Sequence, residues 1–279
     1  MLTRPPTPAL RPFVKTLWAS DLGDATAQAA QRERVLPTGT MSVAFLLGQP
    51  LRLYRDEADA EGHVIGRAVV GGARDTFYLK DISRPQASVG AQLQPGAAEL
   101  LLGVPAGELA GRHTALDDLW GRDASIALEQ FADAPSPAAR VDRLEALLLS
   151  RLPRVRGLRP AVAEALARLS AEPTTEVGDV VASSGFSHRH FIALFRDAVG
   201  LAPKAYARVA RFQAALKRLG APAPRMIDVA LDAGYADQPH YNRDFRAIAG
   251  VSPRGYRRAS PVYENHVPVL GWDRDDVKS

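Results

Sequence analysis

The chain has 279 residues, which suits two domains that each bury a core of their own. It contains no cysteine, which excludes disulfides, thiol redox sensing and cysteine-ligated metal sites. Its net charge is +4, its first residues lead into a proline-rich stretch rather than an apolar signal core, and no apolar run approaches the ~20 residues that span a bilayer. We therefore expect a soluble cytoplasmic protein without a membrane partner.

Short, partly β-branched segments bounded by Gly, Pro or Asp occupy the first hundred residues. Their spacing predicts an antiparallel sandwich or small barrel with strands over residues 41–47, 51–54, 64–70, 76–79 and 88–93. Helical patterns follow over residues 97–102, 116–120, 124–131 and 137–152. The last of these carries an apolar stripe that suits either its own sheet or another subunit.

Residues 153–157, with the sequence Pro-Arg-Val-Arg-Gly, form the predicted linker. A linker this short predicts two halves that lie close together without sharing one core. Charge divides at the same place. Residues 154–260 hold 17 Lys and Arg against 9 Asp and Glu, a net charge of +8, whereas residues 1–153 and 261–279 each carry −2. Such a basic segment is typical of a nucleic-acid-binding domain, although RNA and anionic membranes also attract one.

Within the basic segment, one helical pattern occurs twice, about fifty residues apart. The two copies are Gly185, Phe186, Phe195, Gly200, Pro203, Tyr206 and Gly234, Tyr235, Phe245, Gly250, Pro253, Tyr256. In each copy the first glycine suits a turn with positive φ, and Ser187 or Asp237 is the predicted N-cap of the next helix. A short helix, a turn and an amphipathic helix predict a helix-turn-helix unit in each copy.

A single helix over residues 204–219 is predicted to join the two units, with Pro203 before it and Gly220 after it. A helix of that length spans roughly 24 Å. It therefore permits the second helix of each unit to enter successive major grooves on one face of a duplex. This arrangement favours double-stranded DNA over RNA or membrane.

The duplicated motifs resemble a known family. The carrying segments are Gly185-Phe186-Ser187, Gly200-Leu201-Ala202-Pro203, Gly234-Tyr235-Ala236-Asp237 and Gly250-Val251-Ser252-Pro253, at consistent spacing. Through them, residues 158–258 resemble the DNA-binding domain of the arabinose-regulator (AraC/XylS) family of bacterial transcription factors. The resemblance implies base contacts from both recognition helices, control of nearby promoters, and RNA polymerase as a partner of an activator.

The resemblance also suggests individual contacts. Base contacts fall on the outward first turns of the two recognition helices, at His188, Arg189, Ile192, Gln238, Asn242 and Arg243. Phosphate contacts are expected at Ser187, Arg196 and Arg246. Ile192 and the adjacent Ala193 offer only apolar contacts, for example to thymine methyl groups, so the second unit is the richer predicted base reader.

The N-terminal half resembles an uncharacterised branch of the same family, through Val35-Leu36-Pro37-Thr38-Gly39 and residues 89–98. That branch provides no ligand to transfer. Some relatives carry a repair methyltransferase that needs cysteines, which this chain lacks, and no phosphate loop, GxSxG or HExxH motif occurs. We expect no enzyme, no cofactor and no metal. His188 and His190, two residues apart, fall on different helix faces.

The predicted fold class is α+β, with a β-rich domain over residues 1–153, a tandem helix-turn-helix domain over 154–260 and a C-terminal tail over 261–279. The predicted function is sequence-specific transcription regulation under a small-molecule effector bound to the first domain. One alternative is a constitutive DNA-binding protein whose first domain only dimerises, and another is an enzyme with an unrecognised site. If the first domain acts on the second, it acts by dimerisation, which we favour, or by masking.

Overall fold

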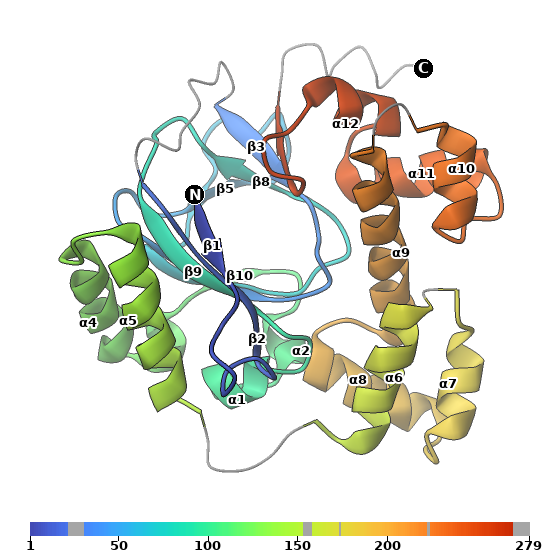
Figure 1. Ribbon diagram of the computed structural model, residues 1–279, viewed down its shortest axis with the longest axis horizontal. Coiled ribbons are helices and arrows are strands. Elements are labelled where there is room, and N and C mark those ends of the chain that lie inside the picture. Colours follow the sequence, from blue (N-terminus) through green and yellow to red (C-terminus); the bar gives the residue numbers. More distant parts are fainter. Residues whose placement is uncertain (22–30, 153–157, 173, 222–223, 270–279) are drawn as a thin grey trace.

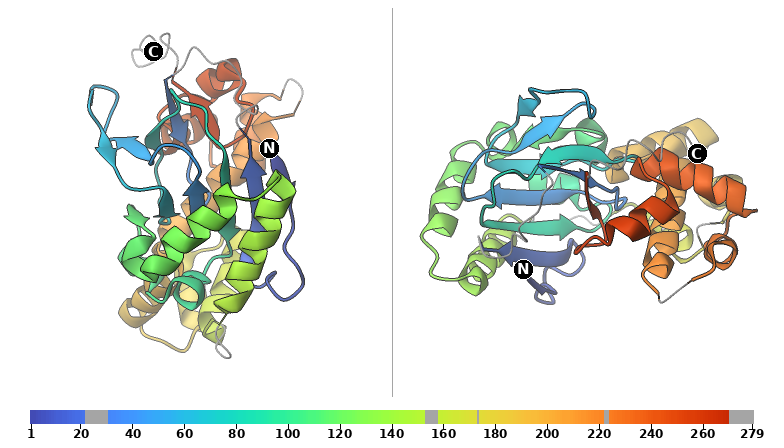
Figure 2. Two further views of the ribbon diagram at one scale, coloured as in Figure 1. Left: turned by 90° about the vertical axis from the view of Figure 1, so that its left-hand side faces the viewer. Right: turned by 90° about the horizontal axis from the view of Figure 1, so that it is seen from above.

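The computed structural model describes residues 1–21, 31–152, 158–172, 174–221 and 224–269. A β-rich N-terminal domain with helices precedes an all-helical C-terminal domain (Figure 1), so the predicted α+β class is confirmed. The strands lie between helices of the N-terminal domain on one side and the C-terminal helices on the other (Figure 2). In the described part of the chain, no helix is long and apolar enough to cross a membrane.

The strands form two antiparallel sheets. The six-stranded sheet has the order β1-β2-β9-β4-β7-β10 and the five-stranded sheet the order β11-β3-β8-β5-β6. Their bounds are β1 Leu2–Arg4, β2 Val14–Ser20, β3 Arg32–Val35, β4 Ser42–Leu46, β5 Arg52–Tyr54, β6 His63–Val64, β7 Ala68–Gly71, β8 Tyr78–Asp81, β9 Ser88–Leu93, β10 His113–Ala115 and β11 His266–Pro268. The rings of Tyr78 and His113, one from each sheet, meet at 4.5 Å, so the sheets face each other.

Alternation along the strands sends one face of the larger sheet toward helices. Val43 and Phe45 on β4 are fully buried, and the Phe45 ring meets Phe131 edge-on at 4.8 Å. The covering helices are α4 (Arg122–Ala132) and α5 (Pro137–Ser150), and α5 packs on β2 and β9. The apolar stripe of α5, with Val141, Leu144 and Leu148, therefore packs against its own sheet.

The remaining helices are α1 (Ala98–Leu102), α2 (Ala106–Leu109), α3 (Asp117–Trp120), α6 (Pro160–Ala171), α7 (Val177–Ser183), α8 (His188–Val199), α9 (Pro203–Leu219), α10 (Met226–Asp232), α11 (Gln238–Ala249) and α12 (Pro253–Ala259). The long joining helix, α9, matches its prediction to within one residue. Gly200 and Gly250 end α8 and α11 in the left-handed conformation, at φ 86° and 71°, where a side chain would be strained.

Several strands escaped prediction. The predicted strand at 64–70 is divided into β6 and β7, and β1, β2, β3, β10 and β11 were not predicted. β3 has the charged sequence RERV, which gives no apolar strand pattern. It is a strand of the fold because its charged side chains are paired inside it. β10 is a three-residue edge strand of polar sequence, which gives too short a pattern to detect.

The two halves are more closely joined than the sequence suggested. Buried residues of the larger sheet and of the first helix-turn-helix unit form one apolar cluster, so the expectation of separate cores is wrong. Within the expected C-terminal tail, β11 is an edge strand paired with β3. Gln213 on α9 donates hydrogen bonds to the Pro37 carbonyl at 2.7 Å and the Asn265 side chain at 2.8 Å. The predicted linker, 153–157, lies outside the described residues.

Candidate nucleic-acid interface

The first unit consists of α7, a turn at Gly185 and α8. Gly185 has φ 74°, as the turn requires. Phe191 and Phe195 on α8 are fully buried, which fixes the opposite face of the helix toward solvent. Ser187 precedes α8 in extended backbone, but its side chain makes no capping hydrogen bond. The hydroxyl is exposed and is not used within the helix.

The second unit repeats this arrangement with α10, a turn at Gly234 (φ 84°) and α11. Tyr241 and Phe245 are its fully buried residues. Here the N-cap forms as predicted, because the Asp237 carboxylate accepts a hydrogen bond from the His240 backbone N–H at 2.6 Å.

The predicted DNA contacts stay at the surface of the two recognition helices. In the first unit Ser187, His188, Arg189 and Arg196 are exposed, and Ile192 is half-buried. In the second unit Asn242 and Arg243 are exposed, whereas Gln238 and Arg246 are half-buried. Each unit thus presents one surface, and the second combines amide and guanidinium groups, which are able to hydrogen-bond to base edges. The nine contacts remain predictions.

Two features at these helices were not foreseen. A histidine in the first turn of each recognition helix packs on the aromatic residue of the preceding turn: His190 stacks on Phe186 at 5.1 Å, and His240 meets Tyr235 edge-on at 5.3 Å. The sequence contained this signal, because histidine occupies the equivalent position in both copies of the repeat. Across the described residues, no group of three or more His, Asp or Glu side chains is arranged to hold a metal ion.

The second unforeseen feature fixes α11 on the joining helix. The Asp244 carboxylate receives Arg208 Nε at 2.5 Å and the Tyr235 hydroxyl at 3.1 Å. The Arg211 guanidinium lies 5.3 Å from the Tyr235 ring centroid. Burial and the neighbouring Asp244 carboxylate raise the pKa of Tyr235 well above its usual value, so the hydroxyl stays a donor. Arg208 and Asp244 are 36 residues apart in the chain, which leaves no local pattern to recognise.

Comparison with known proteins agrees with this geometry. A model described as "Helix-turn-helix domain" matches residues 180–259, and a "Domain of unknown function (DUF6597)" matches residues 2–115. The putative HTH-type transcriptional regulator YkgA of Escherichia coli is 31% identical over 86 residues, 31% of this chain and 36% of the relative. The HTH-type transcriptional activator AarP of Providencia stuartii is 31% identical over 87 residues, 31% of this chain and 64% of the relative.

Residues 180–259 are similar to the helix-turn-helix domains of bacterial transcription regulators, in agreement with the AraC/XylS resemblance of the sequence. The relatives matched are transcription regulators, not enzymes. The matched stretch spans about a third of the first relative and less than two thirds of the second.

Among solved structures, a variant of apo ToxT from Vibrio cholerae aligns with 91% of this chain and 98% of its own, at 11% identity and a TM-score of 0.49. The DNA-binding domain of AdpA, solved with a target DNA, aligns with 36% of this chain and 93% of its own, at 26% identity and a TM-score of 0.34.

The outward face of α8 borders the N-terminal domain. A groove of about 560 Å³ has α2 and the residue before it on one wall and α8 on the other. Its lining residues are Pro105, Gly107, Glu108, Arg189, Ile192, Ala193, Arg196 and Asp197. A side chain at Gly107 would come within 3.1 Å of the Asp197 carboxylate, so the helices are close. Predicted base and phosphate contacts of the first unit thus lie beside α2 and its exposed carboxylate, Glu108.

The ends of both recognition helices also rest on the N-terminal domain. A Cβ added to Gly200 would lie 3.1 Å from the Ala73 Cβ, and one added to Gly250 would lie 2.6 Å from the Phe77 ring. The Phe77 backbone N–H donates a hydrogen bond to the Ile248 carbonyl at 2.8 Å. One loop, residues 72–77 between β7 and β8, therefore reaches both units.

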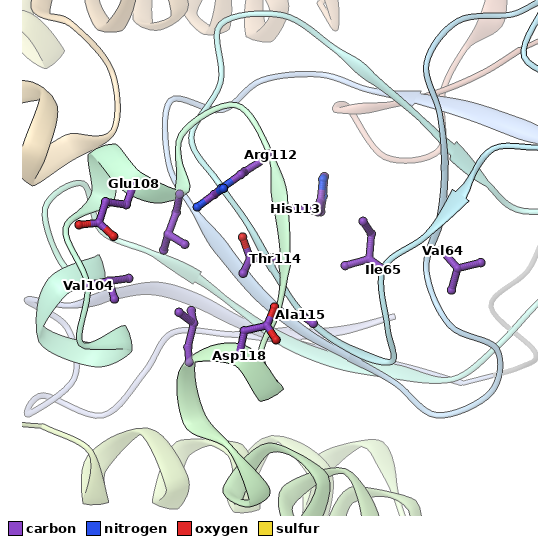
Figure 3. Close-up of a pocket in the computed structure, with 11 residues that line it drawn as sticks. Val64, Ile65, Val104, Glu108, Arg112, His113, Thr114, Ala115 and Asp118 are labelled. Carbon is purple, nitrogen blue, oxygen red and sulfur yellow. The ribbon is translucent and has the colours of Figure 1, made fainter.

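A second groove, of about 450 Å³, lies at the edge strands β10 and β6 of the two sheets. Figure 3 shows Val104 and Glu108 at one end and Val64 and Ile65 at the other. His113 also lines it. Because Glu108 lines both grooves, α2 stands between the opening of the sandwich and the first recognition helix.

Proposed function

We propose that the protein is a sequence-specific transcription regulator that binds duplex DNA through both recognition helices. The observation that carries the proposal is the duplication itself: two exposed recognition faces, held by one 17-residue helix, in a segment of net charge +8. Arg243 and Asn242 supply base-edge donors in the second unit, and Arg189 supplies one in the first. Arg196, Arg246 and Ser187 position the duplex through its phosphates.

The test measures binding of the full chain to operator fragments from the promoter region next to its gene. Binding is followed by fluorescence anisotropy over a range of salt concentrations. Affinity falls steeply with salt because neutralised phosphates release counterions, and a scrambled fragment binds more weakly. Arg122→Ala is the matched control, since Arg122 is exposed on α4 away from the recognition helices. Binding that is indifferent to both salt and sequence contradicts the proposal.

We further propose that a small molecule bound in the N-terminal domain controls this activity. Support comes from the groove at β10 and β6 and from the two places where that domain meets the recognition helices. A calorimetric screen of metabolites against the purified protein tests the proposal. Operator binding that no metabolite alters, from a protein that binds none of them, supports instead a constitutive DNA-binding protein.

For the direction of control we favour restraint of the first unit. The α5 stripe, which suited a subunit interface, is buried against the sheet, and α2 lies beside the base-contact face of α8. The Glu108 carboxylate, placed near that face, disfavours the approach of phosphates. Dimerisation by other surfaces remains compatible with this arrangement, and sedimentation of the full chain with and without operator measures it.

A further inference from the structure

A polar cluster between the two sheets takes no part in the DNA interface. It consists of Glu33 on β3, Tyr78 and Lys80 on β8, His113 on β10 and Arg74 in the loop before β8. Tyr78 and Lys80 lie on one face of β8, opposite Val35 and Glu33 of the neighbouring strand. Contact between Tyr78 and His113 shows that this face points toward the other sheet.

One positive charge of the cluster is already compensated. Lys80 Nζ lies 2.7 Å from the Glu33 carboxylate, which also meets His266 Nδ1 at 2.8 Å. Burial alone would raise the pKa of Glu33, but Lys80 and His266 outweigh it and hold that pKa far below its usual range. The carboxylate is therefore charged, and its Oε1 is already shared by Lys80 and His266.

Arg74 has no such partner in the described part of the chain. Its guanidinium lies 4.4 Å from the Tyr78 ring centroid, and its Nη2 donates to His113 Nδ1 at 3.1 Å. Burial lowers its pKa, and among the described residues no carboxylate forms an ion pair with it. Burial, together with the charges of Arg74 and Lys80, lowers the pKa of His113 to about 3, so the ring is neutral at pH 7. His113 accepts one hydrogen bond and supplies no counter-charge.

The surroundings of Arg74 define the chemistry of a ligand that would bind beside it. A half-buried cation without a counter-ion is costly, and a negative group brought beside it recovers that cost. Tyr78 also packs against an apolar cluster of Leu51, Leu53 and Val69. His113 lines the open groove at β10 and β6, so the cluster borders that groove through His113. The complementary ligand has one negative charge and an apolar body.

We propose that Arg74 anchors a small organic carboxylate between the two sheets, with Tyr78 and the apolar cluster contacting the body of the ligand. A carboxylate matches the planar fork of a guanidinium and carries one charge, whereas a phosphate monoester carries nearly two. This inference rests on the proposed effector control and names the ligand class. Arg74 stands in the loop of residues 72–77, whose Ala73 and Phe77 contact the ends of α8 and α11, so the anchored ligand acts on both recognition helices.

The experiment is calorimetric titration of the full chain with acetate, hexanoate and benzoate, with phenyl phosphate as the phosphate arm and benzamide as the uncharged match of benzoate. At least one carboxylate binds, benzamide binds at least about tenfold more weakly, and Arg74→Gln weakens carboxylate binding by about tenfold or more. Arg67→Gln, which removes an exposed arginine of the same domain, leaves binding unchanged. Arg74→Lys keeps the charge without the fork and gives an intermediate loss.

Circular dichroism of each variant identifies a folding defect, and if Arg74→Gln fails to fold, the intermediate loss in Arg74→Lys decides. The proposal is overturned if none of the three carboxylates binds at millimolar concentration, if benzamide or phenyl phosphate binds as well as benzoate, or if Arg74 variants bind normally. Operator binding is measured on the same samples. A protein that binds operator but no carboxylate loses this proposal alone, whereas carboxylate binding through Arg74 without operator binding contradicts the proposed DNA function.

Discussion

The two helix-turn-helix units share one framework and differ in what surrounds it. The first unit belongs to the buried cluster of the N-terminal domain, and its recognition helix faces the groove beside α2. The second has a largely separate apolar cluster and presents Asn242 and Arg243 to solvent. Repetition of a sequence therefore does not imply repetition of a role. We expect the second unit to read bases and the first to be the point at which the N-terminal domain exerts control.

The largest expected difference between the two units is in how a core substitution in each affects unfolding of the protein. Phe195→Ala and Phe245→Ala each remove a fully buried ring and cost about 3–5 kcal/mol. In a Trp272→Phe background, tryptophan fluorescence reports only Trp18 and Trp120 of the N-terminal half. Phe195→Ala lowers the midpoint of that signal because the core is shared. Phe245→Ala lowers the midpoint of an early unfolding transition that is followed by helical circular dichroism. It leaves the midpoint of the fluorescence transition unchanged. A fall in fluorescence midpoint in both variants contradicts a division between the units.

Base recognition provides the next test. Arg243→Ala costs about 1–3 kcal/mol of operator affinity and relaxes specificity, because it removes a guanidinium from the base-reading turn. Arg189→Ala costs less, since its helix carries apolar Ile192 and Ala193 beside it and lies against α2. Competition with single-base operator variants measures both. Equal losses, or a larger loss at Arg189, show that the first unit reads bases as well as the second.

Substitution of Arg246 distinguishes a residue that positions the duplex through its phosphates from one that reads its bases. Arg246→Ala weakens all sequences alike and lowers the slope of log affinity against log salt by about 1, because one phosphate contact is lost. Anisotropy titrations on operator and scrambled DNA at several salt concentrations provide both numbers. A sequence-dependent loss instead assigns Arg246 to a base.

The smallest expected effect concerns α2. Glu108→Gln raises operator affinity by a few-fold, as removal of one exposed charge near the predicted contacts is worth about 0.2–1 kcal/mol. Glu129→Gln, at an exposed site on α4, is the matched control and leaves affinity unchanged. Lower affinity in Glu108→Gln contradicts restraint by α2 and indicates that the carboxylate organises the interface.

Much of the C-terminal domain was predictable because its signals are local. Glycines that need positive φ, buried aromatics at helical spacing and the cap at Asp237 all act within a dozen residues, and they recur with the repeat. The same patterns identified β4, β5 and β9 and the helical character after Pro95. The short or charged strands β3, β10 and β11 were missed, because pairing across the sheet, rather than local alternation, makes them strands.

Other properties depend on residues that are distant in the chain. The Asp244 contact with Arg208, the shared core, the meeting of α2 with α8 and the contact of Arg74 with His113 all join segments whose separation leaves no periodic trace. Sequence pattern predicted the duplicated units and their outward faces, since turns, caps and amphipathic helices are set by near neighbours. Which of those faces lies free and which lies against the N-terminal domain was settled by packing, because burial and Coulomb interactions depend on distance in space rather than along the chain.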